Sequence, residues 1–384
     1  MTASPLQALP IERLRERTST KWRAYPADVL PLFVAETDFP LAPAITARLR
    51  AAVEIGDTGY TPPKPGIAEA YAVFARRRYG WEIDPAHVRS TGDVVMGLVE
   101  ILRATISPGD RVVITPPVYP PFYDLIPEAG GVVETVPLLA DAGYTLDLAG
   151  IEAALAGGAR AVLLCNPHNP TGTVHSRETL AELAEIAARH GAIVVSDEIH
   201  APLVHAPATF IPFLSASPVA ASVGYAVASA SKAFNLAGLK CALMSTAADH
   251  TRRVVQGLPK EVEWRTGHFG ALAGVAAFSP ESDEWLDALL AALDANRHLL
   301  ADLLAEHVPA ARYAIPDAGY LAWVDLSGLG WGEDPAERIL TEARVAVHHG
   351  PTFGDEGRGF VRVNFGCSPE VLREAIERIG ELSR

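Results

Sequence analysis

Cysteine is scarce in this chain of 384 residues, in which only Cys165, Cys241 and Cys367 occur. Three cysteines cannot form a disulfide framework, and such low usage is typical of proteins in a reducing compartment. Long hydrophobic runs are also missing, since no stretch approaches the roughly 18 apolar residues that a membrane-spanning helix needs. Residues 1–22 lack the apolar segment of a secretory signal. We therefore expect a soluble, cytoplasmic protein that has no membrane partner.

Positive charge is limited, with 32 Lys and Arg against 46 Asp and Glu, which gives a formal net charge of −14. Because nucleic-acid backbones and anionic membranes repel an acidic protein, we expect no nucleic-acid partner. Hydrophobic residues make up 49% of the chain and charged residues 20%, which is a globular composition. At about 150 residues per domain, the length predicts two or three domains.

Short apolar segments alternate with longer helical patterns over most of the chain. This alternation is typical of an α/β fold in which helices cover both faces of a mostly parallel sheet. The predicted strands are residues 111–115, 161–165, 192–196, 225–229 and 242–245. The predicted helices are residues 44–54, 67–78, 94–106, 176–190 and 284–306, and Ser176 is a suitable N-cap for the fourth of them.

The C-terminal part of the chain has a different pattern. Predicted strands at 320–326 and 360–365, with helices at 335–343 and 369–379, indicate a smaller α+β unit. We therefore predict an N-terminal segment that joins the small domain (1–45), a large domain (46–275) and a small C-terminal domain (276–384).

Chemically active side chains follow three of the predicted strands. Asn169 lies in Asn-Pro-His-Asn-Pro-Thr-Gly, Asp197 in Ser-Asp-Glu-Ile-His, and Lys232 in Ser-Ala-Ser-Lys. Ligands of open α/β sheets bind at the carboxyl ends of the strands, where these residues are expected to meet. Together they match the needs of pyridoxal phosphate (PLP): an amine forms an imine with its aldehyde, and a carboxylate keeps its ring nitrogen protonated. The amide can donate a hydrogen bond to the phenolate oxygen.

With these motifs in this order, the chain resembles the fold-type I PLP enzymes, the class I/II aminotransferase superfamily, from about residue 30 to its end. The resemblance implies that Lys232 is the Schiff-base lysine, Asp197 the partner of the pyridinium nitrogen and Asn169 the donor to O3′. It also implies that Tyr119, in Pro-Pro-Val-Tyr-Pro-Pro-Phe, stacks on the cofactor ring.

The same resemblance implies a phosphate site. Gly92, Asp93 and Val94 match the turn into a helix whose N–H groups hold the phosphate, and helix N-termini do favour anions. Asp93 would direct its own charge elsewhere or cap the helix. Ser229 and Ser231 match the hydroxyls that precede the lysine, and the resemblance favours Ser229 as the phosphate ligand.

Two further residues carry implications for the substrate and the assembly. Arg362, in Arg-Val-Asn-Phe-Gly, matches the arginine that clamps the α-carboxylate of an amino-acid substrate, a task that suits a planar guanidinium. Tyr60, in Gly-Tyr-Thr-Pro-Pro, matches a tyrosine that reaches the cofactor phosphate of the neighbouring subunit. The resemblance therefore implies a homodimer with shared active sites and a small-molecule substrate.

Departures from the common pattern point to one branch. His200 replaces the tyrosine that usually follows the aspartate, and Ser-Asp-Glu-Ile-His resembles the MalY/PatB-like cystathionine and cysteine-S-conjugate β-lyases. The stretch Val-Ala-Glu-Thr-Asp-Phe resembles a segment that lies beside the substrate in this branch, which makes Ala35 a candidate substrate contact, although Glu36 and Thr37 depart from the branch. Lys240 stands where an arginine usually binds phosphate, and it offers only a point charge.

The sequence thus predicts a PLP-dependent carbon–sulfur β-lyase that converts L-cystathionine or related cysteine S-conjugates to a thiol, pyruvate and ammonia. Alternatives are an aminotransferase, a specialised conjugate lyase of thiol detoxification or secondary metabolism, and a non-catalytic binding protein of the same fold. His200 is equally compatible with a cofactor-binding role near O3′ and with a structural role at the end of a strand. His348 and His349 are adjacent on a predicted strand and point to opposite faces, so we predict no metal site.

Overall fold

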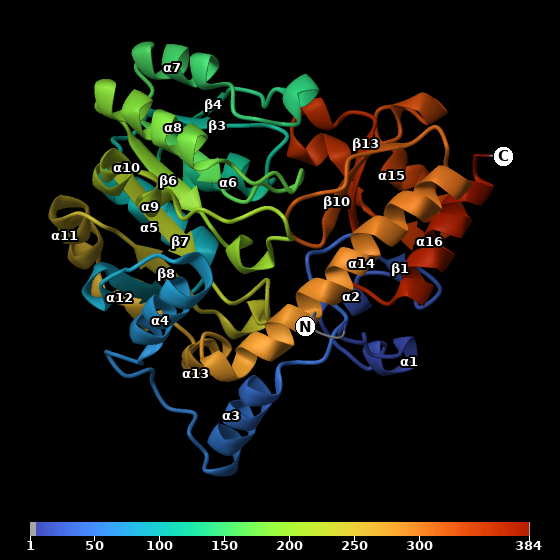
Figure 1. Ribbon diagram of the computed structural model, residues 1–384, viewed down its shortest axis with the longest axis horizontal. Coiled ribbons are helices and arrows are strands. Elements are labelled where there is room, and N and C mark those ends of the chain that lie inside the picture. The colour runs from blue at the N-terminus through green and yellow to red at the C-terminus, as the bar shows by residue number, and fades with distance from the viewer. Residues whose placement is uncertain (1–4, 384) are drawn as a thin grey trace.

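A seven-stranded sheet forms the centre of the larger of two units in the computed structural model, which describes residues 5–383 (Figure 1). The strand order is β2-β8-β7-β6-β5-β3-β4, and only β8 runs antiparallel to its neighbours. The predicted mostly parallel sheet is therefore confirmed. The strands are β2 (Val88–Thr91), β3 (Arg111–Ile114), β4 (Val132–Thr135), β5 (Ala161–Cys165), β6 (Ile193–Asp197), β7 (Gly224–Ala228) and β8 (Ala242–Ser245).

Helices cover both faces of this sheet, as the apolar strands require. Successive side chains of a strand point to opposite faces. Accordingly Val112 packs in one buried cluster with Leu98 and Phe122, whereas Val113 packs in a second cluster with Leu183. The helices of this unit are α3 (Pro43–Glu54), α4 (Ile67–Tyr79), α5 (Val94–Thr105), α6 (Pro121–Glu128), α7 (Leu148–Ala156), α8 (Arg177–Arg189), α9 (Phe213–Ala216), α10 (Pro218–Val223), α11 (Asp249–Gly257), α12 (Lys260–Trp264) and α13 (His268–Ala277).

Helix α8 shows how local sequence signals set an element. Ser176 caps it, because its Oγ accepts a hydrogen bond from the backbone N–H of Thr179. Leu180, Leu183 and Ile186 then recur at helical spacing and are buried against the sheet. The predicted helix and its cap are both present.

The smaller unit combines the C-terminal third with the N-terminal segment. A four-stranded antiparallel sheet has the order β12-β13-β10-β9, and β1 pairs in parallel with β11. Its strands are β1 (Leu30–Pro31), β9 (Arg312–Tyr313), β10 (Leu321–Asp325), β11 (Val345–Ala346), β12 (His348–His349) and β13 (Phe360–Asn364). Its helices are α1 (Ile11–Leu14), α2 (Thr20–Arg23), α14 (Asp283–His307), α15 (Pro335–Arg338) and α16 (Pro369–Glu381), and α15 continues into a π-helical turn over Ile339–Ala343.

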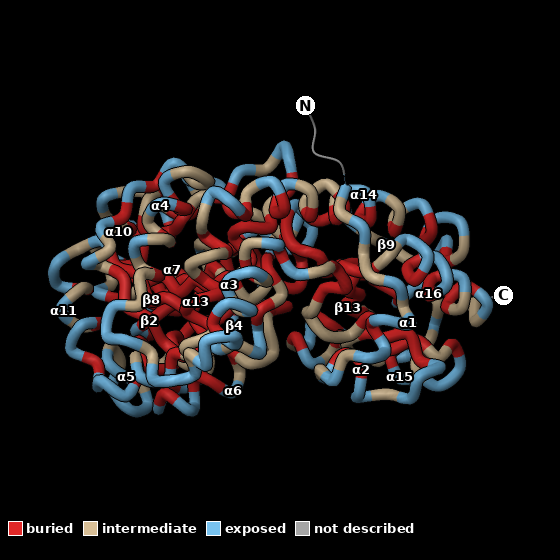
Figure 2. The backbone as a smooth tube through the Cα atoms, turned by 90° about the horizontal axis from the view of Figure 1, so that it is seen from below, coloured by how far each residue is buried: buried red, intermediate tan, exposed pale blue. Residues whose placement is uncertain are grey.

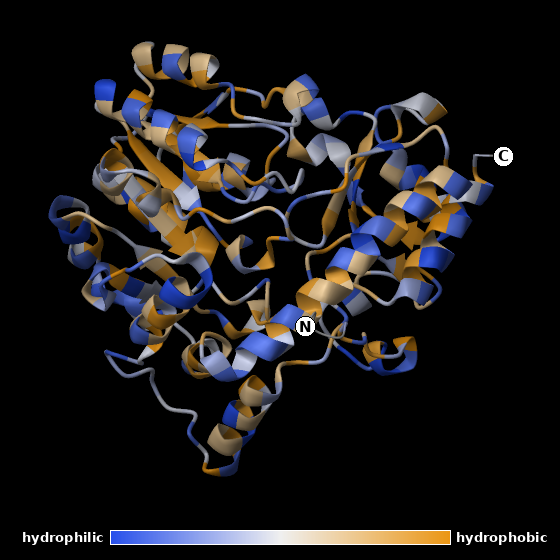
Figure 3. Ribbon diagram, in the orientation of Figure 1, coloured by the Kyte–Doolittle hydropathy of each residue, from blue (hydrophilic) through white to orange (hydrophobic). Residues whose placement is uncertain are grey.

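Helix α14 runs from the larger unit along the smaller one (Figure 1). Figure 2 shows that buried residues are concentrated in the centres of both units, and Figure 3 that the strands of both sheets are hydrophobic. The proposed domain limits at 45 and 275 fall inside α3 and α13. Within residues 5–383, no helix is long and apolar enough to cross a membrane.

Candidate active site

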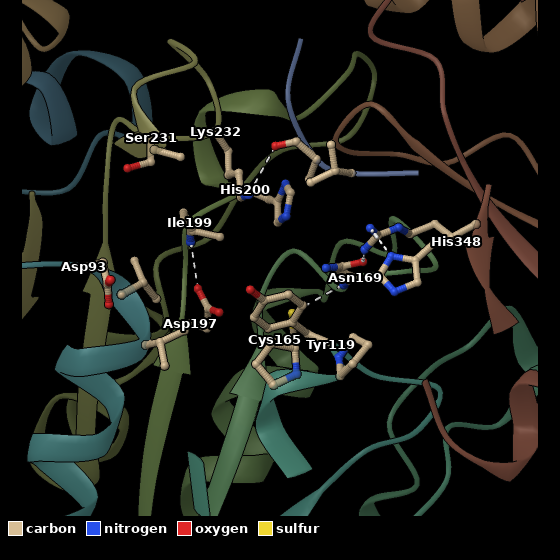
Figure 4. A pocket seen from close by; sticks show the side chains of 18 of the residues that line it. Asp93, Tyr119, Cys165, Asn169, Asp197, Ile199, His200, Ser231, Lys232 and His348 are labelled. Atoms are coloured by element: carbon tan, nitrogen blue, oxygen red, sulfur yellow. Dashed lines mark hydrogen bonds between the residues drawn. The ribbon is translucent and has the colours of Figure 1, made fainter. Parts of the chain in front are cut away.

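A cavity of about 490 Å³ lies at the carboxyl ends of the parallel strands, facing the smaller unit (Figure 4). Most of the residues singled out in the sequence line it: Ala35, Asp93, Val94, Tyr119, Asn169, Asp197, His200, Ser231, Lys232, Lys240 and Arg362. The position of these residues at the ends of neighbouring strands therefore brings the amine, the carboxylate and the amide to one space, although Asn169 and Asp197 are 28 residues apart and Asp197 and Lys232 are 35 residues apart.

Lys232 follows β7 in a tight turn and points into the cavity. Its Nζ donates a hydrogen bond to the carbonyl oxygen of Ala35 at 3.2 Å. Burial and the nearby charge of Arg362 lower the pKa of Lys232 to about 8. A substantial fraction of the amine is therefore neutral near pH 8, and the neutral form is the one that attacks a carbonyl carbon.

Asp197 is the last residue of β6. Its Oδ1 accepts a hydrogen bond from the backbone N–H of Ile199 at 3.1 Å, while no described residue donates to Oδ2. Burial raises the pKa of this carboxyl to about 7, and the charge of Lys232 only partly opposes the rise. A buried carboxyl of this kind gains much from a basic nitrogen placed beside it.

Asn169 and Arg362 are joined across the cavity. The Nη1 of Arg362 donates to Oδ1 of Asn169 at 3.0 Å. Since a guanidinium only donates, the amide oxygen must face Arg362, which leaves the NH₂ group of Asn169 to donate elsewhere. Tyr119 also lines the cavity, and burial raises the pKa of its phenol to about 12, so the hydroxyl stays protonated.

The N-terminus of α5 forms another end of the cavity. Asp93 caps this helix, because its Oδ1 accepts from the backbone N–H of Met96 at 2.9 Å, and its Oδ2 lies 2.8 Å from Nζ of Lys240. Lys240 has a φ of 58°, a strained value for a residue other than glycine. Gly92 lies so close to Arg265 that a Cβ at position 92 would be 3.1 Å from the carbonyl oxygen of Arg265. The turn thus presents helix N–H groups and an ammonium group, which suits an anion.

The two serines before the lysine point in different directions. Ser229, which the sequence favours as the phosphate ligand, is buried, and its Oγ donates to the carbonyl of Cys241 at 2.7 Å. Ser231 lines the cavity and contacts the Oγ of Ser229 at 2.7 Å. The structure therefore places Ser231 at the cavity wall and Ser229 behind it.

His200 lies at the cavity and Tyr60 lies outside it, although the sequence suggested a role in the active site for both. His200 lines the cavity, and its Nδ1 is buried without a hydrogen-bond partner among residues 5–383. Burial and the charges of Lys232 and Arg362 lower the pKa of His200 to about 3, so its imidazole is neutral. Tyr60 lies outside the cavity on the loop between α3 and α4, with a relative exposure of 103%.

The N-terminal segment forms one wall of the cavity, and sequence reasoning found only part of it. Phe33, Val34 and Ala35 line the cavity. The side chain of Asn364 donates to the carbonyls of Val34 and Glu36 at 2.6 and 2.7 Å, which ties this wall to β13. Just beyond it, Lys21 and Asp38 form an ion pair at 2.8 Å in which both side chains are 1% exposed.

The chemistry of this donor set fits PLP. The cavity offers a partly neutral lysine amine, a buried carboxyl with an unshared oxygen, an amide NH₂ and a helix N-terminus beside a cation. Each matches one polar group of the cofactor, namely the aldehyde, the ring nitrogen, the phenolate oxygen and the phosphate. Among the described residues, two of these groups have partners within the protein: Nζ of Lys232 donates to the carbonyl of Ala35 at 3.2 Å, and Lys240 pairs with Asp93 at 2.8 Å.

Comparison with known proteins agrees with this geometry. Residues 28–379 match the family described as aminotransferase class I and II. The cystathionine beta-lyase of Corynebacterium glutamicum is 37% identical over 97% of this chain and 98% of its own length, and cystathionine beta-lyase PatB of Bacillus subtilis is 34% identical over 92% of both. The PLP-bound C-S lyase of Staphylococcus hominis has a TM-score of 0.87 at 26% identity and covers 95% of this chain and 94% of its own.

The sheet topology and the cavity are those of a PLP-type aminotransferase fold, and the chain belongs to the aminotransferase class I and II family. The predicted family and fold class are therefore confirmed. The names of the relatives agree with the predicted cofactor and with the predicted branch of carbon–sulfur lyases.

Proposed function

We propose that this protein is a PLP-dependent carbon–sulfur β-lyase that cleaves L-cystathionine or related cysteine S-conjugates to a thiol, pyruvate and ammonia. One observation carries the proposal: Lys232, Asp197 and Arg362, from three separate elements, face one cavity in a chain whose relatives are named cystathionine beta-lyases. Lys232, Asp197, Asn169 and the turn around Asp93 would hold the cofactor.

Bound PLP supplies an electron-accepting ring that stabilises negative charge at the Cα of an attached amino acid. Arg362 holds the α-carboxylate of the substrate through its guanidinium N–H groups. Lys232 removes the Cα proton, and its pKa of about 8 suits a base working near neutral pH. Asp197 would keep the ring nitrogen of the cofactor protonated, and the free NH₂ group of Asn169 would donate a hydrogen bond to the phenolate oxygen. Elimination breaks the Cβ–S bond, and the leaving thiolate takes up a proton that the ammonium group of Lys232 can return.

The experiment that tests this function uses one substrate and no oxo acid. An amino-acid conjugate plus one water should give equal amounts of thiol, pyruvate and ammonia, continuously over many turnovers. An aminotransferase would stop after a single turnover, since its amino group has no acceptor. We expect continuous release from S-methyl-L-cysteine or L-cystathionine, measured as thiol by a chromogenic disulfide and as pyruvate by lactate dehydrogenase.

A single turnover that restarts when an oxo acid is added would identify an aminotransferase instead. His200, in place of a tyrosine near the cofactor site, and the sequence Ser-Asp-Glu-Ile-His favour the lyase. If neither substrate reacts, the proposed cleavage of these conjugates is wrong.

We further infer a homodimer whose sites are shared. Tyr60 is fully exposed, and Val53 and Ile55 at the end of α3 have relative exposures of 64% and 80%. Helix α3 and the loop that follows it project from the rest of the molecule (Figure 1). Clustered exposed apolar side chains are typical of protein interfaces. A partner subunit covering this projection would take Tyr60 out of water and carry it toward the partner's phosphate site.

Mixing two damaged proteins tests the shared site. Tyr60→Phe and Lys232→Ala subunits, each impaired alone, should form mixed dimers in which one of the two sites has both normal residues. With random reassortment, activity should recover to about a quarter of the wild-type value. Activity that stays at the sum of the separate variants, or a monomeric mass by light scattering, would contradict the inference.

A further inference from the structure

His348 and Arg362 form a cross-strand pair on the small sheet. His348 on β12 lies directly opposite Arg362 on the antiparallel strand β13. Directly opposed residues share one face of a sheet, so both side chains reach the cavity, which both of them line. Figure 4 shows His348 beside Asn169 at the end of the cavity nearest the small sheet.

The hydrogen bond between the two side chains has a fixed direction. Nη2 of Arg362 lies 2.8 Å from Nδ1 of His348. A guanidinium has no acceptor, so Nδ1 must accept and the ring proton must be on Nε2. Phe353, which is fully buried, packs against both partners, with its ring centroid 5.0 Å from the Arg362 guanidinium carbon and 4.9 Å from that of His348. The pair is therefore held in one orientation.

Counting donors shows what Arg362 has left for a ligand. Both N–H groups of Nη2 are used, one by His348 and one by the carbonyl of Phe33 at 3.1 Å. Nη1 uses one of its two N–H groups on Asn169. Nε is buried and has no partner among the described residues. The guanidinium thus keeps two donors, Nε–H and one Nη1–H, that no described residue uses. They lie on different edges of the guanidinium plane and Nε is buried, so the Nη1–H beside Asn169 is the donor left for a carboxylate oxygen.

The neutrality of His348 matters for this arrangement. Burial and the charge of Arg362 lower the pKa of His348 to about 3, so it stays uncharged at any working pH. An uncharged acceptor orients the guanidinium and leaves its full positive charge for the substrate. A carboxylate at the same place would orient it equally well but would also neutralise it, and would compete with the ligand.

We propose that His348 is the positioning residue of the substrate-carboxylate clamp: a neutral acceptor, paired in register with Arg362, that sets which guanidinium donors face the substrate. This inference rests on the proposed function of Arg362 and adds a residue to it. His348 acts through Arg362 and has no role in breaking the carbon–sulfur bond, so it should affect KM much more than kcat.

The test measures carboxylate binding apart from turnover. The probe is 3-(methylthio)propanoate, which is S-methyl-cysteine without its amino group and therefore cannot react. Its affinity for the holoenzyme is measured by calorimetry, beside KM and kcat for S-methyl-L-cysteine. The variants are His348→Asn, whose amide oxygen can replace Nδ1, His348→Ala, which has no acceptor, and His348→Asp, whose acceptor is charged.

We expect His348→Asn to keep most of the affinity, His348→Ala to weaken binding about tenfold, and His348→Asp to weaken it about a hundredfold despite restoring an acceptor. KM should follow the same order while kcat changes little. His349→Asn is the matched control, because His349 bonds Asp334 at 2.7 Å and does not line the cavity. Arg362→Lys, which lacks the fork, should lose the probe in every background.

Equal binding by wild type and His348→Ala would overturn the proposal, as would His348→Asp binding as tightly as His348→Asn. A wild-type holoenzyme that does not bind the probe would overturn it too. A folding defect would instead lower the melting temperature and kcat together. Absence of thiol release with the expected order of probe affinities would refute the lyase function alone, so the two failures are distinguishable.

Discussion

Lys232→Ala will abolish turnover, with a loss of at least about 10⁴-fold in kcat, the upper end of what a general base contributes. Two effects combine, since the variant would lose both the amine proposed to bind the cofactor aldehyde and the base proposed to take the Cα proton. Lys240, the other lysine at the cavity, is paired with Asp93 at 2.8 Å and cannot replace it. Thiol release under saturating S-methyl-L-cysteine measures the loss.

Chemical labelling tests the assignment of Lys232 in a second, independent way. The wild-type protein should be yellow, and borohydride should fix the cofactor to the peptide that contains Lys232. Lys260→Ala is a suitable control, since Lys260 is an exposed lysine at the start of α12. Label on another lysine, or a purified protein that never binds PLP, would contradict the assignment of Lys232 as the cofactor-binding lysine.

Asp197→Asn should lower kcat by roughly 10²–10³-fold, as expected for the loss of one charge-stabilising group in a buried site. An amide has no negative charge with which to keep the ring nitrogen protonated, so the cofactor accepts electrons poorly. KM should change little, because no hydrogen bond joins Asp197 to Arg362, the residue proposed to bind the substrate carboxylate. Steady-state kinetics on cofactor-saturated protein separate the two parameters.

Glu198→Gln is the matched control for this prediction. It removes a carboxyl one residue along the chain, but Glu198 accepts hydrogen bonds from Ser196 and from the backbone N–H of Phe213 and does not line the cavity. Burial raises the pKa of Glu198 to about 8, so it is mostly neutral at pH 7 and an amide replaces it closely. Equal kcat losses in both variants would mean that any replacement of a buried carboxyl by an amide at this strand end is harmful, and would contradict a specific role of Asp197.

The large sheet and its catalytic edge could be predicted because the information is local. Strands β5, β6 and β7 are continuous apolar runs, and parallel pairing then fixes which ends meet, so Asn169, Asp197 and Lys232 follow without knowledge of any contact. The edge strands β2 and β4 were beyond prediction, since β2 (Val-Arg-Ser-Thr) is mostly polar and β4 (Val-Val-Glu-Thr) is only partly buried, so neither is a continuous apolar run.

The finer parts of the site depend on turns and on pairings distant in sequence. Whether Ser229 or Ser231 faces the cavity is decided by the turn after β7, which no periodic pattern reports. The pairing of His348 with Arg362 arises from the register of β12, a strand of two residues that leaves no signal of its own. Only the three-dimensional structure, in which β12 pairs antiparallel with β13, shows that a histidine lies opposite Arg362.

Residues 21–38, which precede the first helix of the larger unit, build and support one wall of the cavity. Ala35 supplies the carbonyl that Lys232 and Tyr320 both bond, at 3.2 and 2.9 Å, and its neighbours wall the cavity. The buried Lys21–Asp38 pair anchors that wall from the N-terminal side, and removing one partner of such a pair typically costs about 3–5 kcal/mol. A chain cloned from the first strand of the large sheet would retain Lys232, Asp197 and Asn169, yet it would leave them facing open water.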